Sequence, residues 1–271
     1  MIAPRTSIAK KKEQNRKALR NVAIAALLIS PIAYFYFQAM LAHQSLDPET
    51  LCPTTPSSIT VLLVDVTDAM NVPQRQDFTN QLERLRSSIP RYGKLAVYKV
   101  DPISDRLLTP VITRCNPGTA KDVSEVNGNP QQTQEQWEKN FRQPLDRAFH
   151  ELLRASGAKR SPILESIQSA ALTEFQSPGV DGKPRRLIVA SDLLQNTDSI
   201  SFYKSLPEPS QLTTSQAFSR VRTDLRGVDV ELWMLQRGDS RVTQPRLLPD
   251  LWDQIISKQG GNVLRVYTVS G

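Results

Sequence analysis

The sequence predicts an α/β fold: a three-layer α/β/α sandwich with a mostly parallel six-stranded sheet, preceded by one transmembrane helix. Three observations lead to this prediction. Nearly continuous aliphatic runs such as Ile59–Val66 are typical of parallel strands covered by helices on both faces. Stretches with apolar residues three and four positions apart separate these runs, which indicates helices between strands. The uncharged run Val22–Leu41 is long enough to cross the roughly 30 Å hydrocarbon layer of a membrane.

Strands are expected where apolar, β-branched segments are bounded by turn residues. These segments are Ile59–Val66, Lys94–Val100, Leu107–Thr113, Arg185–Ser191, Val228–Leu235 and Asn262–Val269. The short Asp101-Pro102 turn suits an antiparallel hairpin between the second and third strands. If the sheet order is 3-2-1-4-5-6, the first and fourth strands flank the point where the strand order reverses.

Helices are expected where apolar residues form one helical face. Two of them contain Phe78–Ile89 and Trp137–Leu153, and three more cover Ser161–Phe175, Thr214–Leu225 and Leu247–Lys258. Ser161 is expected to cap its helix, with Pro162 in the first helical position. The segment Asn116–Thr133 is rich in Asn, Gly, Pro and Gln and is expected as a loop.

The N-terminal region predicts a membrane anchor. Its expected divisions are a basic cytoplasmic tail at 1–21, a transmembrane signal anchor at 22–42, a linker at 43–58 and one domain at 59–271. Because basic residues stay on the cytoplasmic side, the domain is expected to be periplasmic or extracellular, on a single-pass protein of the inner or plasma membrane. A cleaved signal peptide is the alternative, but cutting after Ala42 would place Met40 at the −3 position, where a small residue is usual.

Charge gives little support to nucleic-acid binding. The formal net charge is +7, but the first 42 residues hold seven basic side chains and one acidic one, Glu13. The remainder is therefore near +1, which lacks the basic surface typical of a nucleic-acid-binding domain.

The only cysteines, Cys52 and Cys115, both fall in the part expected outside the cytoplasm. An oxidising compartment allows them to pair. A bridge would close a loop of about 60 residues and contribute about 3 to 4 kcal/mol. A catalytic pair of cysteines usually has closer spacing and a basic neighbour, so a structural disulfide is the favoured interpretation.

Four oxygen-bearing side chains are expected at one edge of the sheet. Asp65 and Asp192 follow the first and fourth strands, Thr67 opens the next helix, and Ser161 begins the helix before the fourth strand. In open α/β sheets, ligands bind beyond the carboxyl ends of the strands where the strand order reverses. Hydroxyl and carboxylate oxygens suit Mg²⁺, which keeps several waters and needs few protein ligands.

Residues 59 to 270 resemble the von Willebrand factor A domain in the order of their elements and in these positions. The metal-ion-dependent adhesion site of that family has Asp-x-Ser-x-Ser after the first strand, a later Thr and a later Asp. This chain has Asp65-Val-Thr67-Asp-Ala69, Ser161 and Asp192. The resemblance implies that Asp65 and Asp192 bind waters while Thr67 and Ser161 contact Mg²⁺, with Mn²⁺, Ca²⁺ or no ion as alternatives. Ala69 removes one expected oxygen, and Leu193 stands where glycine commonly follows the Asp.

A partner surface is expected around the same edge. The segment Leu193–Leu212 is long for a connection, and such loops are often binding surfaces. The candidate partner contacts are Asp68, Asn196, Phe202 and Tyr203. Three of these have a structural alternative: Asp68, or Thr67 beside it, would cap the following helix, and Phe202 and Tyr203 would pack inward to hold the loop.

These features predict a membrane-anchored extracytoplasmic binding protein that recognises a protein partner and is not an enzyme. The alternatives are a structural subunit of an envelope-spanning assembly and a metal-dependent phosphoester hydrolase. A hydrolase triad would need His150, which lies on an expected amphipathic helix, and the chain lacks G-x-S-x-G, the P-loop and H-E-x-x-H.

Overall fold

The structure is a computed structural model of the whole chain. It describes residues 6–41, 45–66, 69–102, 107–124, 128–153, 159–237 and 244–269. Two compact units make up the chain, Met1–Ser45 and Leu46–Gly271, and each is described by itself.

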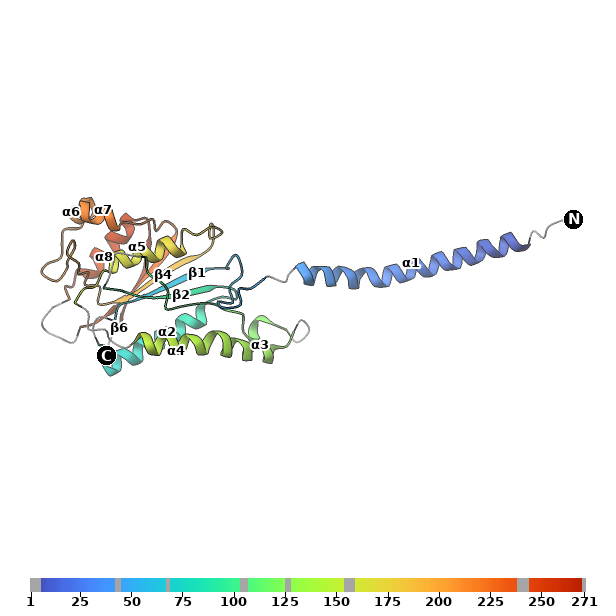
Figure 1. Cartoon of the computed structure of the whole chain (residues 1–271), viewed down its shortest axis with the longest axis horizontal. Coiled ribbons are helices and arrows are strands. Elements are labelled where there is room, and N and C mark those ends of the chain that lie inside the picture. Colours follow the sequence, from blue (N-terminus) through green and yellow to red (C-terminus); the bar gives the residue numbers. More distant parts are fainter. Residues whose placement is uncertain are drawn as a thin grey trace. The chain divides into compact units, whose positions relative to one another are not determined.

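The first unit is one helix, α1, which spans Thr6–Leu41 (Figure 1). Within it, Asn15–Phe37 has a mean hydropathy of 1.6. These 23 residues are long and apolar enough to cross a membrane, since an α-helix rises about 1.5 Å per residue. The segment therefore fits a membrane anchor by length and composition, criteria that a signal sequence near the N-terminus also meets.

The second unit is built on a six-stranded sheet with the order β3-β2-β1-β4-β5-β6 (Figure 1). The strands are β1 Ile59–Val64, β2 Lys94–Lys99, β3 Ile112–Cys115, β4 Arg185–Ser191, β5 Val228–Leu235 and β6 Asn262–Val269. All neighbouring pairs are parallel except β2 and β3. Every residue of β1 is buried, as its continuous aliphatic sequence predicts for a strand covered on both faces.

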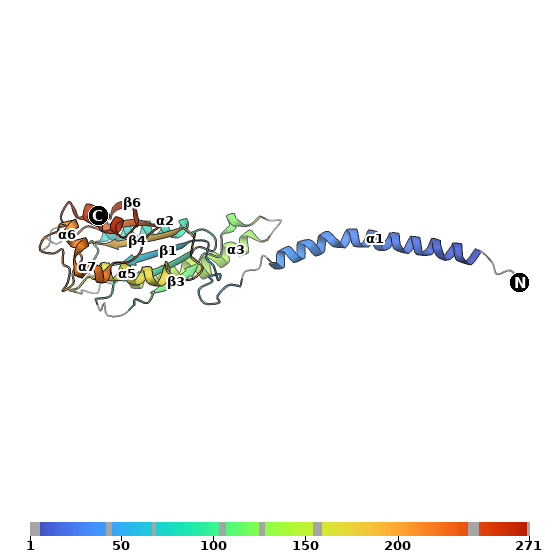
Figure 2. The same ribbon diagram turned by 90° about the horizontal axis from the view of Figure 1, so that it is seen from above.

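Helices cover the two faces of the sheet, and each face has its own apolar core (Figures 1 and 2). The helices are α2 Val72–Ser88, α3 Pro130–Trp137, α4 Gln143–Leu152, α5 Ile163–Glu174, α6 Pro209–Thr214, α7 Gln216–Val221 and α8 Leu248–Lys258. One core joins β-strand residues to α5, α6, α7 and α8, and the other joins them to α2, α3 and α4. This arrangement confirms the predicted fold class, a three-layer α/β/α sandwich with a mostly parallel six-stranded sheet.

The strand predictions were accurate for β4, β5 and β6, but the third strand lies later than predicted. It covers Ile112–Cys115 instead of Leu107–Thr113, and it pairs antiparallel with β2 as expected. The expected loop Asn116–Thr133 contains a 3-10 turn, Ala120–Asp122, and the start of α3 at Pro130.

The helix expected around Trp137–Leu153 is interrupted by a π-helical turn at Glu138–Arg142. Pro144 lies just beyond this turn. Proline lacks an N–H group and its ring clashes with the carbonyl four residues before it. A wider turn relieves that clash while the chain keeps its direction, so Trp137 and Phe141 stay in the same core as Phe149.

Residues 46–58 fold against the domain before β1 begins. Leu46 forms an isolated bridge with Pro53, and the Cys115 N–H donates to the Thr50 carbonyl at 2.9 Å. The disulfide Cys52–Cys115 is present, with the two Cα atoms 4.8 Å apart and the two residues 63 positions apart in the chain. It ties the segment before β1 to the last residue of β3.

A buried polar network joins β2 to α5. The Tyr98 hydroxyl donates to Glu174 Oε1 at 2.7 Å, and Lys94 Nζ lies 2.6 Å from Glu174 Oε2. Burial raises the pKa of Tyr98 well above its usual value, and the negative charge of Glu174 raises it further. The phenol therefore stays protonated in the folded protein at pH values where an exposed tyrosine ionises.

Removing the disulfide should destabilise the second unit. We expect Cys52→Ser/Cys115→Ser to lower the free energy of unfolding by about 4 kcal/mol, because the unfolded chain regains the freedom of a long loop. Urea unfolding of the full chain, with and without reductant, measures the difference. Reductant should destabilise the natural protein but leave the double variant unchanged. Equal stability of the natural protein and the double variant, both measured without reductant, would contradict the expectation.

The Tyr98 network should give a specific loss of stability in alkali. A group whose pKa is raised on folding stabilises the protein below its unfolded pKa, near 10, and this contribution is lost as pH rises above that value. We expect Tyr98→Phe to cost about 1 to 3 kcal/mol below pH 10, since Glu174 loses a donor. Unfolding curves at a series of pH values should show the two proteins converging above pH 10; a constant gap would refute the linkage.

Candidate functional site

The strand order reverses between β1 and β4. From β1 the chain builds outward through β2 and β3, and from β4 it builds the other way through β5 and β6. Asp65 directly follows β1 and Asp192 directly follows β4, so both lie beyond the carboxyl ends of adjacent parallel strands. This is the position at which open α/β sheets bind ligands.

The register of β1 and β4 places Ser191 beside Asp65. Val64 pairs with Ala190, and the Asp65 N–H donates to the Ala190 carbonyl at 2.8 Å. The Ser191 hydroxyl lies 3.1 Å from Asp65 Oδ2 and 3.4 Å from Asp192 Oδ1. Since a hydroxyl has one proton, Ser191 donates to one carboxylate at a time, and it lies within reach of both.

Ser161 is not the helix cap that the sequence predicts. Its main chain pairs with Asn196 through two hydrogen bonds, at 3.0 and 2.9 Å, and its hydroxyl donates to Asp65 Oδ2 at 2.5 Å. Helix α5 begins at Ile163, with Pro162 in the cap position. The side chain of Gln195 performs part of the capping, because its Oε1 accepts from the Leu164 N–H at 2.9 Å.

Asp192 is paired with an arginine from the segment after β5. Arg237 Nε lies 3.2 Å from Asp192 Oδ2, and the two side chains are 14% and 7% exposed. Oδ1 of Asp192 accepts from the Leu194 N–H at 2.9 Å. The guanidinium of Arg237 also lies over the ring of Tyr203, 5.4 Å from its centroid. A charge this well buried is stable only with such partners.

Gln244 holds the strand ends around this ion pair. Its Nε2 donates to the main-chain carbonyls of Asp192, at 2.9 Å, and Leu235, at 2.8 Å. Its Oε1 accepts from the Arg237 N–H at 2.9 Å. One amide therefore connects the carboxyl ends of β4 and β5 with the backbone of Arg237.

The residue after Asp192 has an unusual backbone. Leu193 has φ of +62°, in the left-handed region that favours glycine. The Leu193 N–H donates to Ser191 Oγ at 2.9 Å, and its carbonyl accepts from Trp252 Nε1 at 2.8 Å. Its side chain is fully buried in the core. Packing and these two hydrogen bonds hold a conformation that costs a non-glycine residue on the order of 1 kcal/mol.

The chemistry of the expected Mg²⁺ site can be compared with these contacts. Asp65, Asp192 and Ser161 supply hard oxygens of the kind that Mg²⁺ prefers, whereas Thr67 and Asp68 lie outside the described residues. Oδ2 of Asp192 is paired with Arg237, and Ala69 has no side-chain oxygen. In the described part of the chain, no group of three or more His, Cys, Asp and Glu side chains could hold a metal ion. The guanidinium lies beside Asp192 Oδ2, where the resemblance places a water bound to the ion, and Ala69 supplies no oxygen, so the described residues do not reproduce the full site implied by the resemblance.

The expected partner contacts have different surroundings. Phe202 is 1% exposed and packs edge-on against Trp252, so it belongs to the core and offers no surface to a partner. Tyr203 is half-buried against Arg237. Asn196 is also half-buried, and its side chain holds the loop by donating to the Lys159 carbonyl at 2.8 Å and accepting from the Ser201 hydroxyl at 3.0 Å.

Four polar residues of this site were absent from the predicted set: Ser191, Gln195, Arg237 and Gln244. Two of them had a usable signal. Ser191 is the last residue of β4 and falls beside Asp65 once the register is known, and Arg237 follows the carboxyl end of β5 by two residues. Gln195 and Gln244 act through contacts with segments distant in sequence, which no local pattern shows.

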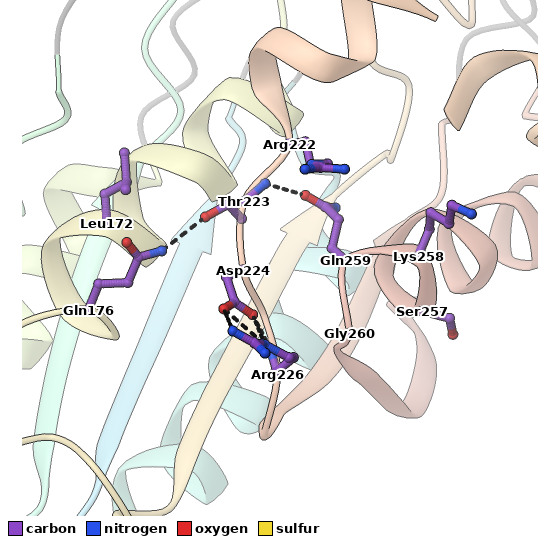
Figure 3. Close-up of a pocket in the computed structure, with 10 residues that line it drawn as sticks. All are labelled: Leu172, Gln176, Arg222, Thr223, Asp224, Arg226, Ser257, Lys258, Gln259 and Gly260. Carbon is purple, nitrogen blue, oxygen red and sulfur yellow. Dashed lines mark hydrogen bonds and ion pairs between the residues drawn. The ribbon is translucent and has the colours of Figure 1, made fainter. Parts of the chain in front are cut away.

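A separate hollow of about 570 Å³ lies near the start of β5, at the opposite edge of the sheet (Figure 3). Its lining residues are Leu172, Gln176, Arg222, Thr223, Asp224, Arg226, Ser257, Lys258, Gln259 and Gly260. Arg226 pairs with Asp224 and lowers the pKa of that carboxyl to about 2. Lys258 ends α8, where a cation interacts favourably with the terminal carbonyls. These charges have structural explanations, and no predicted site residue lines the hollow.

No protein-family model matches the chain, and no curated protein matches it. Among the solved structures that are similar to the chain, two share 11% sequence identity with it. One is an aerotolerance-related membrane protein from Bacteroides fragilis NCTC 9343 with multiple mutations to serines, aligned over 79% of this chain and 92% of that chain with a TM-score of 0.33. The other is the conserved hypothetical protein BatB from Bacteroides thetaiotaomicron, aligned over 78% and 91% with a TM-score of 0.37. Because both scores are below 0.5, the fold assignment rests on the strand order and the layers.

Ser191 should be important for the stability of the carboxyl edge. In Ser191→Ala the Leu193 N–H loses its acceptor and Asp65 loses a donor, both in buried positions. We expect the free energy of unfolding to fall by about 1 to 3 kcal/mol. Urea unfolding measures this change, with Ser199→Ala, in an exposed position, as the matched control. Equal effects of the two substitutions would show that the Ser191 contacts are not significant.

Proposed function

We propose that this protein is a membrane-anchored, extracytoplasmic binding protein that recognises a protein partner with the carboxyl edge of its sheet. The observation that supports this proposal is the cluster of Asp65, Asp192, Ser161 and Ser191 at the point where the strand order reverses. These four residues, together with Tyr203 and Arg237, are named the site edge.

The site edge is costly to build. Asp65 and Asp192 are 3% and 6% exposed, and burying a carboxylate requires partners that compensate for lost hydration. The two apolar cores of the sheet stabilise the fold without such groups. Places where a stable fold contains buried charge tend to be functional. This edge is also the position at which the fold class binds its ligands.

The N-terminal helix supports the proposed location. Seven basic side chains precede or begin the apolar segment, and basic flanks remain in the cytoplasm. This charge distribution supports a domain beyond the membrane, in the periplasm or outside the cell. The disulfide Cys52–Cys115 agrees with an oxidising compartment.

The residue types at the site edge suit a protein partner. Tyr203 and Arg237 lie against each other, and Lys204 beside them is exposed. Tyrosine and arginine are enriched where protein interfaces have most of their binding energy. Phe202 is left out of the proposed surface because it is buried.

We propose no catalytic role for the site edge. Ser161 and Ser191 donate to a carboxylate and have no histidine beside them in the described contacts. His150, an exposed residue of α4, lies in a helix of the opposite layer from α5. A serine hydrolase needs a base within hydrogen-bonding reach of its nucleophile.

Partner binding should depend on the two carboxylates. We expect Asp65→Asn and Asp192→Asn in the full chain to reduce by at least about tenfold the yield of cross-links from a photoreactive group at Lys204 in native membranes, because a loss of about 1.4 kcal/mol in binding changes affinity tenfold. Asp229→Asn, an exposed position near the start of β5, is the matched control.

Thermal unfolding must show that the variants remain folded. Cross-links of the same yield in all four proteins would disprove the proposed function and favour a structural role in which the anchor and outer helices make the contacts.

A further inference from the structure

We infer that Arg237 is the resident cation of the site edge, and that this edge works without a divalent ion. The inference rests on the proposed function, because it concerns how the same edge is charged when a partner binds. The guanidinium takes the place beside Asp192 that the resemblance to metal-dependent adhesion sites would give to a water bound to Mg²⁺.

The negative charge at the site edge requires a cation nearby. Two carboxylates lie within reach of one hydroxyl, that of Ser191, and both are buried. Like charges this close destabilise each other and the fold unless a cation compensates them. Arg237 supplies that charge, with Nε 3.2 Å from Asp192 Oδ2 and with most of its side chain removed from solvent.

Arg237 is fixed in this position by its neighbours. The Tyr203 ring supports the guanidinium from one side, and Gln244 accepts from the Arg237 N–H. The same Gln244 donates to the carbonyl of Asp192, so both partners of the ion pair are attached to one amide. The contacts with the Tyr203 ring, Gln244 and Asp192 leave the Arg237 side chain little rotamer freedom. This loss of freedom favours a permanent ion pair.

Oδ1 of Asp192 accepts a hydrogen bond, and Oδ2 lies beside a cation. A hydroxyl that donates to a carboxylate can still offer a lone pair to a metal, so the bonds of Ser161 and Ser191 to Asp65 do not themselves exclude an ion. The conflict lies at Asp192, where Oδ1 accepts a main-chain N–H and Oδ2 faces Arg237. Mg²⁺ demands near-octahedral oxygen geometry and keeps several waters, and a fixed guanidinium beside Oδ2 takes the space of the water that Asp192 would hold.

This arrangement explains the alanine at position 69. The adhesion-site pattern has a serine there, whose hydroxyl would coordinate the ion directly. With a guanidinium in place of the metal, an oxygen at this position is no longer required, and the exposed Ala69 costs nothing. Charge recognition at the edge then depends on an arginine, whose charge does not vary with pH or with the supply of ions.

The test uses the full chain in detergent and four variants: Arg237→Gln, Arg237→Lys, Asp192→Asn, and Asp192→Asn combined with Arg237→Gln. Thermal unfolding is measured in EDTA and in millimolar MgCl₂. We expect the natural protein to unfold at the same temperature in both. Arg237→Gln should lower the midpoint by about 5 to 10 °C, because it leaves a buried carboxylate without its cation.

The double variant identifies the cause of that loss. If Arg237 acts by compensating the charge of Asp192, adding Asp192→Asn should recover most of the loss, and Arg237→Lys should retain part of the stability because it keeps the charge. A purely structural role for the arginine side chain would make the two single effects add. Arg186→Gln, which breaks the partly buried pair with Glu231 near the other edge of the sheet, is the control that Asp192→Asn should not rescue.

Two results would overturn the inference: a rise in the midpoint of the natural protein with MgCl₂ that Asp192→Asn abolishes, or additive effects of the two single substitutions. The cross-linking assay in native membranes separates this inference from the proposed function. A cross-link yield that falls in Asp65→Asn and is unchanged by EDTA supports both the inference and the proposed function. Cross-links that depend on Asp65 but disappear in EDTA overturn the inference alone, and cross-links that never depend on Asp65 overturn the proposed function.

Discussion

The pairing of buried charge at the carboxyl edge of the sheet is the constraint around which the rest of this site is arranged. Asp65 and Asp192 are removed from water, and each must be compensated within a few ångströms. Hydroxyls from Ser161 and Ser191 compensate the first, and Arg237 compensates the second. The left-handed turn at Leu193 is a consequence of the same requirement, because it lets the chain leave β4 while Ser191 and Asp192 stay in place.

The two cores make this edge possible. Packing on both faces of the sheet fixes the register of β1, β4 and β5, and the register in turn fixes which side chains meet beyond the strand ends. A parallel strand moved by one residue would turn Asp65 to the opposite face. The apolar layers therefore position the polar site even though they make no contribution to its chemistry.

The predicted metal site and the inferred arginine pair differ in which cation balances the carboxylates. The pattern Asp65, Ser161 and Asp192 is shared with metal-dependent adhesion sites, and its members do meet at one edge. The pattern concerns ligands only, however, and contains nothing about which cation they surround. An arginine from a different strand end, Arg237, supplies a charge that the pattern assigns to an ion. A ligand motif thus predicts the position of the carboxylates better than it predicts which cation balances their charge.

The sequence by itself determined the layers, the strand positions of β4, β5 and β6, and the meeting of Asp65 with Asp192, because hydrophobic periodicity and strand order are properties of continuous segments. The inward position of Phe202, the capping of α5 by Gln195 and the pairing of Asp192 with Arg237 were decided only by the tertiary structure. Each of these depends on two segments being brought side by side by packing, and the identity of a side chain does not show in advance which distant neighbour it will meet.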